Sequence, residues 1–186
     1  MLVIAQGNTK GDYMSKSKET VNFNEGLYIA FNKGKNIIGK AIAGWTLGKF
    51  SHVELIVDNV SFSSGGTDGG VREKDVKYNL NEWEIHKLSE DMFNKDKILE
   101  FYNETGGYKY DWRGIFARQF LWFLNKDNAH EYFCSEWCIE ALDRACDLGL
   151  EYNGKPLLLK GYAEFSPNRL HKYLIDYGII DNNSKI

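Results

Sequence analysis

The three cysteines of this chain lie in the stretch AHEYFCSEWCIEALDRACDLG, residues 129–149. Cys134 falls in the first turn of a predicted amphipathic helix, where free backbone N–H groups and the helix dipole stabilise a thiolate. Because the thiolate is the nucleophilic form of cysteine, this position predicts a reactive thiol. The alternative is an inert residue, since free cysteines are often buried. Cys138 and Cys146 lie deeper in the same helix, and we interpret them as core residues.

A neighbouring imidazole also activates a thiol, and His52 is the best candidate. It begins the predicted strand SHVELIV, residues 51–57, at a point where it could meet a helix N-terminus packed on the sheet. Side chains of a strand repeat every second residue, so Glu54 is expected on the same face, where it could orient His52 and stabilise its charge. Ser63 on the next predicted strand is an alternative for that role. The other histidines are expected inside a strand (His86), in a loop (His130) and on the exposed side of the last helix (His171).

The stretch GGYKYDWRGIF, residues 106–116, contributes a third candidate. Its aromatic residues alternate just before a predicted apolar helix, and Asp111 is suited to cap that helix. Packing is the ordinary role of aromatic residues in this position. A tyrosine hydroxyl close to the Cys134 sulfur could also donate a hydrogen bond to an oxyanion, and the stretch offers Tyr108 and Tyr110.

Composition limits the classes of protein to consider. The chain has 186 residues, of which 43% are hydrophobic and 15% aromatic, as expected for one compact domain. A net charge of −3, spread along the chain, gives no basic surface for nucleic acid. The apolar windows are too short for an integral membrane segment, and the N-terminus lacks a signal pattern. An odd number of cysteines is typical of reduced thiols, so we expect a cytoplasmic protein.

The hydrophobic pattern predicts an α+β fold. Residues 1–25 show no sustained period and are expected to form an N-terminal arm, followed by one domain at 26–186. Strands are predicted at 27–31, 51–57, 60–63, 71–76 and 82–88, in a sheet of four or five strands, with a turn at 58–59 and a glycine-rich loop at 63–70. Helices are predicted at 36–47, 96–103, 112–124, 133–148 and 167–177, the last with Ser166 as N-cap, Pro167 in its first turn and Gly178 at its end.

The motifs SHVELIV, YKYDWRGIF and YFCSEW, in this order, resemble the circularly permuted branch of the papain-like NlpC-type amidase/peptidase superfamily, the YiiX-like group. In that branch the histidine strand precedes the cysteine helix, and the likeness covers residues 26–176. The resemblance implies a papain-like antiparallel sheet packed against helices, with a thiol hydrolase domain at 26–186. It also implies that Cys134 is the nucleophile and His52 the base, and that Tyr110 matches the tyrosine preceding the nucleophile. The third polar residue stays open between Glu54 and Ser63.

The resulting hypothesis is a cysteine hydrolase that cleaves an amide bond without a cofactor or metal. His52 accepts the thiol proton, Cys134 attacks the carbonyl carbon, and the Cys134 N–H and Tyr110 stabilise the oxyanion. The resemblance favours a peptide or cell-wall substrate. A lipid acyl ester is an alternative, because the permuted scaffold also resembles lecithin–retinol acyltransferases and the apolar helix at 112–124 could line an acyl pocket.

Two other classes of function compete with a hydrolase. His130, Cys134 and Cys138 are spaced four residues apart, as ligands of a zinc ion on one helix face would be. A non-enzymatic binding protein or phage structural protein could keep the fold without turnover. The composition, rich in Asn and Lys, is compatible with a bacterial or phage protein, and the sequence leaves the oligomeric state open.

Overall fold

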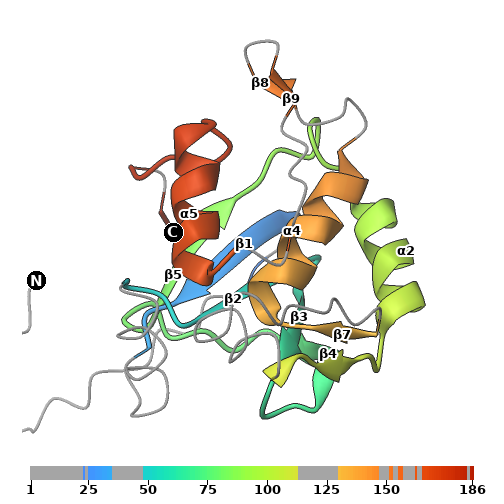
Figure 1. The fold of residues 1–186 in the computed structure, drawn as a ribbon. Coiled ribbons are helices and arrows are strands. Elements are labelled where there is room, and N and C mark those ends of the chain that lie inside the picture. Colours follow the sequence, from blue (N-terminus) through green and yellow to red (C-terminus); the bar gives the residue numbers. More distant parts are fainter. Residues whose placement is uncertain are drawn as a thin grey trace, which may run out of the picture.

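The computed structural model describes residues 23, 25–34, 48–112, 130–146, 151–152, 155–156, 162, 165–183 and 185–186. This part of the chain forms an α+β fold, in which a seven-stranded, mostly antiparallel sheet packs against three helices (Figure 1). The strand order is β5-β1-β2-β3-β4-β6-β7, and β6–β7 is the parallel pair among the described strands. The α+β class is the predicted one.

The elements follow one another in a simple order along the chain. They are β1 (Leu27–Asn32), β2 (His52–Val57), β3 (Val60–Gly65), β4 (Gly70–Asp75), β5 (Trp83–Lys87), α2 (Lys95–Thr105), β6 (Lys109–Tyr110), β7 (Glu131–Tyr132), α4 (Cys134–Ala145), β8 (Glu151–Tyr152), β9 (Lys155–Pro156) and α5 (Pro167–Asp176). Strands β1 to β5 confirm the five predicted strands. The predicted sheet was too small, because β6 and β7 extend its edge and two residues are too few to show a strand period.

The hairpin between β2 and β3 turns on two residues with left-handed backbone. Asp58 has φ 45° and Asn59 has φ 68°, as in the two-residue turns whose twist matches that of the flanking strands. Asp and Asn tolerate this conformation better than other residues with a side chain. The Asp58 carboxylate also accepts a hydrogen bond from the Gly26 N–H at 2.9 Å, which fixes the start of β1 beside the turn. The predicted turn is confirmed.

Both faces of the sheet are covered. Helices α2, α4 and α5 pack on one face, where Trp137, Phe31 and Phe101 are among the fully buried side chains (Figure 1). The opposite face carries a smaller apolar cluster that includes Tyr28, Ile85 and Tyr78. Phe23, which lies in the segment predicted as an arm, is buried in this second cluster. The rest of that segment, 1–22 and residue 24, lies outside the described residues.

The helices match the predictions where they are described. Helix α4 begins at Cys134 and ends at Ala145, earlier than the predicted 148, and residues 147–150 lie outside the described part. Helix α5 is capped as predicted: the Ser166 hydroxyl accepts from the Arg169 N–H at 3.2 Å, and Gly178 follows with φ 65°. The predicted helix at 36–47 lies outside the described residues, as does that at 112–124 after its first residue. None of the described helices combines the length and hydropathy needed to cross a bilayer.

The contact between β4 and β6 depends on a close backbone approach at Gly70. This residue has φ 138°, and a Cβ there would clash with the carbonyl oxygen of Tyr108. That same oxygen accepts from the Val71 N–H at 2.8 Å. The strand that carries Tyr110 is therefore attached to the sheet only if residue 70 has no side chain.

We expect Gly70→Ala to lower the free energy of unfolding by about 2–4 kcal/mol, because it adds a clash to the cost of a positive φ. Gly69→Ala is the matched control. Gly69 also has a positive φ of 87°, but its Cβ would meet no atom within 4 Å. The control should lose only about 1–2 kcal/mol in urea-induced unfolding. Equal losses in the two variants would contradict the role of the close approach.

Candidate active site

Cys134 is the first residue of α4 and is almost fully buried, with 3% of its surface exposed. The first intrahelical hydrogen bond runs from the Trp137 N–H to the Phe133 carbonyl at 3.1 Å. The N–H groups earlier in the helix have no partner in the preceding turn, so they are available to a negative charge. The Ser135 N–H, which is one of these groups, donates to the Cys134 sulfur.

Two neighbouring strands of the sheet separate beside the N-terminus of α4. Strands β2 and β3 pair from their hairpin only as far as Leu55, and then they separate. The Val53 backbone is consequently satisfied by side chains instead of by β3. Its carbonyl accepts from the Ser63 hydroxyl at 2.7 Å and lies 3.7 Å from the Cys138 sulfur, and its N–H donates to the Cys134 sulfur. Helix α4 thus meets β2 through hydrogen bonds, and this contact brings Cys134 to the start of β2.

His52 begins β2 and forms a side-chain hydrogen bond with Cys134. Its ring Nε2 also lies 3.1 Å from Glu54 Oε1. Burial alone would lower the pKa of His52, but the charge of Cys134 and the bonds to Cys134 and Glu54 raise it to about 10. Burial would raise the pKa of the Cys134 thiol, but the His52 charge and the N–H donors hold it below its ordinary value. The two groups therefore form a thiolate–imidazolium pair.

Glu54 is a buried carboxylate, 6% exposed, and three donors besides His52 hold it. The Ser61 hydroxyl donates to Oε2 at 2.6 Å, the Tyr78 hydroxyl donates to the same oxygen, and Arg72 forms an ion pair with Oε1. Burial would raise the pKa of Glu54, but the hydrogen bond and charge of His52, the charge of Arg72 and the Ser61 hydroxyl lower it well below its ordinary range. Glu54 is thus ionised, and it lies on the same side of β2 as His52.

Tyr110 reaches the site through the parallel pairing of β6 with β7. Its strand partner is Tyr132, two residues before Cys134, and the Ser64 hydroxyl donates to the Tyr132 carbonyl at 2.7 Å. Burial raises the pKa of Tyr110, and so do the nearby negative charges of Cys134 and Asp111. The hydroxyl therefore keeps its proton and is available as a hydrogen-bond donor next to the thiolate.

The structure brings together Cys134, His52, Glu54 and Tyr110, and it leaves the other candidates apart. The Ser63 hydroxyl donates to the Val53 carbonyl and not to His52. Strands β2 and β3 are no longer paired at this position. Cys138 is fully buried, and burial together with the Cys134 charge raises its pKa well above that of an ordinary thiol. Cys146 is half-buried at the end of α4.

Of the histidines outside the site, His130 lies before α4 as predicted, and His171 corrects a prediction. His130 precedes β7 in a turn and packs edge-on against Tyr108 at 4.9 Å between ring centroids. The three-ligand clusters within the described residues do not include His130 with Cys134 and Cys138, because His130 is not on the helix that their spacing assumed. His171 was predicted to be exposed but is partly buried against the Phe50 ring, because α5 turns that side towards the sheet.

Sequence reasoning missed Arg72 and Tyr78, which both bind the Glu54 carboxylate. Arg72 lies in the charged strand segment VREKD, which is typical of a solvated strand, and Tyr78 lies in the irregular segment after β4. The one available signal is the polarity of Glu54 within the apolar strand HVELIV. A carboxylate at such a position requires donors from neighbouring elements, although the sequence does not say which.

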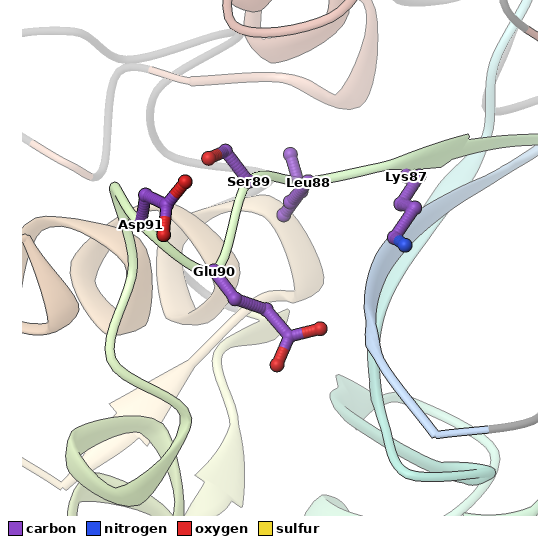
Figure 2. Close-up of a pocket in the computed structure, with 5 residues that line it drawn as sticks. All are labelled: Lys87, Leu88, Ser89, Glu90 and Asp91. Carbon is purple, nitrogen blue, oxygen red and sulfur yellow. The ribbon is translucent and has the colours of Figure 1, made fainter.

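Comparison of the chain with family models, with curated proteins and with solved structures gave no match. A pocket lies elsewhere, where the chain leaves β5 for α2, and is lined by Lys87, Leu88, Ser89, Glu90 and Asp91 (Figure 2). It contains no thiol or imidazole, so the chemistry of Cys134 does not depend on it.

The electrostatics predict that Cys134 ionises at lower pH than an ordinary thiol, whose pKa is about 8.5. The thiolate absorbance, measured as wild type minus Cys134→Ser, should therefore titrate below that value. In His52→Ala the midpoint should move to higher pH, because burial remains and the imidazolium is lost. The wild-type ion pair should persist up to about pH 10, where His52 releases its proton. An unchanged midpoint in His52→Ala would contradict the pair.

The donors around Glu54 predict a loss of stability when one hydroxyl is removed. Tyr78→Phe should lower the free energy of unfolding by about 1.5–3 kcal/mol at neutral pH, as expected for a bond to a buried carboxylate. Since the folded-state pKa of Glu54 is lowered, this stability is present above its ordinary pKa and disappears as the pH falls through the folded-state value.

Tyr28→Phe is the control for this experiment. Tyr28 belongs to the same apolar cluster as Tyr78 but is not among the hydrogen-bond partners of Glu54. Its loss in urea-induced unfolding should stay within about 0.5 kcal/mol. If the two variants lose the same stability, the bond from Tyr78 to Glu54 contributes nothing.

Proposed function

We propose that this protein is a cysteine hydrolase of the permuted papain-like type, which cleaves an amide bond with Cys134 as nucleophile. The observation that carries the proposal is the hydrogen-bonded pair of Cys134 and His52 at a helix N-terminus, with Glu54 bonded to the imidazole. A nucleophile, a base and a group that orients the base are the parts that thiol hydrolysis requires. The order of the histidine strand and the cysteine helix is the one that the resemblance to the permuted branch implies.

In the proposed reaction the Cys134 thiolate attacks the carbonyl carbon of the substrate and forms a tetrahedral intermediate. The Cys134 N–H and the Tyr110 hydroxyl donate to its oxyanion. His52 then gives its proton to the leaving nitrogen, and the amine departs to leave a thioester on Cys134. A water molecule, deprotonated by His52, attacks the thioester, and the acid product and the free thiolate result. No metal or cofactor takes part in these steps.

The proposed substrate is a peptide or cell-wall amide. Trp112 is exposed, packs edge-on against the Tyr110 ring at 4.8 Å and lies over Gly66, so it offers an apolar surface on the Tyr110 side of the thiol. The acyl-ester alternative relied on an apolar helix at 112–124. All of that segment after Trp112 lies outside the described residues. A reducing compartment such as the bacterial cytoplasm would suit a free catalytic thiol, whether the gene is bacterial or phage-encoded.

The proposal predicts that Cys134→Ser and His52→Ala each lower amide hydrolysis by at least about 1000-fold while the fold is retained. The assay measures amine release from a panel of peptides and cell-wall peptides, with acyl esters included to separate the two substrate classes. Intact mass measurement after incubation with a peptidyl vinyl sulfone should show one adduct on the wild type and none on Cys134→Ser.

Cys146→Ser is the control, because Cys146 lies at the other end of α4 and is not part of the site. It should keep both turnover and labelling at wild-type levels. Turnover that survives in Cys134→Ser, or labelling that is lost equally in Cys146→Ser, would overturn the assignment of the nucleophile.

A further inference from the structure

A second group of titratable side chains lies in the interface between β5 and α5, a strand and a helix that do not carry Cys134. Glu84 and His86 project from β5, and His171 projects from α5. The His86 Nε2 lies 3.3 Å from Glu84 Oε1, and the His171 Nε2 lies 2.9 Å from the same oxygen. One possible ligand atom from each of the three residues lies within 4.8 Å of the ligand atoms of the other two.

The three side chains are buried and fixed by their neighbours. The side chain of Glu84 is 2% exposed, that of His86 0% and that of His171 15%. The Phe31 ring packs edge-on against both imidazoles, with ring centroids 6.4 Å from His86 and 4.9 Å from His171. The cluster therefore needs little reorganisation to present its oxygen and two nitrogens to a common point.

Helix α5 is held rigidly at this place. Asn168, one turn before His171, accepts from the Phe50 N–H and donates to the Phe50 carbonyl, both at 2.8 Å. This two-way bond fixes the first turn of α5 against the segment that leads into β2. Residue 48 must be glycine for this approach, because a Cβ on Gly48 would overlap the Asn168 amide.

We propose that Glu84, His86 and His171 form a binding site for a divalent transition-metal ion, for which Zn²⁺ is the best fit. Two imidazole nitrogens and one carboxylate oxygen are a ligand set that Zn²⁺ accepts, with a water molecule as the fourth ligand. A tetrahedral Zn²⁺ with bonds of about 2.0 Å holds its ligand atoms roughly 3.3 Å apart. The two distances to Glu84 Oε1 are already close to this value.

The surroundings of His86 also suit a metal ligand. The Nδ1 of His86 is buried and has no hydrogen-bond partner within standard distance and angle limits among the described residues. The Asp181 backbone lies close to the ring. A backbone carbonyl beside the outer nitrogen is a common means of orienting a metal-binding histidine.

Two lysines compete with the metal ion in this site. The Lys185 ammonium lies 3.1 Å from Glu84 Oε1, and Lys49 forms an ion pair with Oε2. Both side chains are exposed and flexible, so they can turn towards solvent when a metal ion binds the carboxylate. Lys185 also follows the last turn of the chain and forms a β-bridge with His86. A bound ion would join β5 to α5, and this role is independent of the hydrolase activity.

The test is a zinc titration of the chelator-treated full chain, with a chromophoric chelator as competitor. Wild type and Cys134→Ser should each bind one equivalent, with a higher melting temperature after loading. His171→Ala should weaken binding by at least about 100-fold, since loss of a ligand exceeds the effect of a residue outside the coordination sphere. Lys185→Gln should bind at least as tightly as wild type, because a competing charge is removed.

A spectroscopic measurement keeps the proposal testable if His171→Ala fails to fold. Cobalt-loaded wild type should show a tetrahedral absorption spectrum without thiolate-to-cobalt charge transfer, as expected for nitrogen and oxygen ligands. The proposal is overturned if wild type binds no equivalent of zinc in the titration, if His171→Ala binds as tightly as wild type, or if the cobalt spectrum shows thiolate ligation. None of these results depends on hydrolysis, so they leave the proposed function untouched.

Discussion

The buried carboxylate of Glu54 is the constraint on which the candidate site depends. A charge in the interior costs several kcal/mol unless partners compensate for it, and here the partners come from separate elements: β3 supplies Ser61, β4 supplies Arg72 and the following segment supplies Tyr78. Glu54 therefore ties these elements to β2. The same carboxylate stabilises the charged form of His52, and the charged His52 stabilises the Cys134 thiolate. The negative charge of Glu54 therefore favours the ionised form of both groups.

A second requirement is that β2 stops pairing with β3 part-way along its length. In a continuous ladder the Val53 N–H and carbonyl would be used by β3, and a helix end could not bond to them. Because the strands separate after Leu55, the Val53 N–H is available to the Cys134 sulfur. The site thus lies where the pairing of β2 with β3 stops and where α4 begins. At this point β2 and the first turn of α4 each have backbone N–H groups without a partner in regular secondary structure. These donors need no reorganisation when a negative charge develops nearby.

Sequence reasoning reached the elements whose signals are local. The β2 strand, with His52 and Glu54 on one face, follows from a period of two, and α5 follows from its caps at Ser166 and Gly178. The long-range partners could not be found in this way. Alternation alone assigns Ser61 and Ser63 to the same face of β3, and only the separation of the strands decides that Ser61 meets Glu54 while Ser63 meets the Val53 carbonyl. The burial of His171 likewise depends on how α5 packs on the sheet, and this is determined by the bonds between Asn168 and Phe50, which are 118 residues apart in the chain.

The chain contains the same pair of residue types twice, and the surroundings give the two pairs opposite properties. His52 and Glu54 are two residues apart on β2, and Glu84 and His86 are two residues apart on β5. Beside His52 a second anion, the Cys134 thiolate, acts together with Glu54 to outweigh burial, and the pKa of the imidazole rises to about 10. Beside His86 the additional neighbours are a lysine and another histidine, so burial prevails and the pKa falls. The same two residue types thus give an imidazole with a raised pKa on β2 and one with a lowered pKa on β5. The charge of the third neighbour decides this difference, and the local sequence does not.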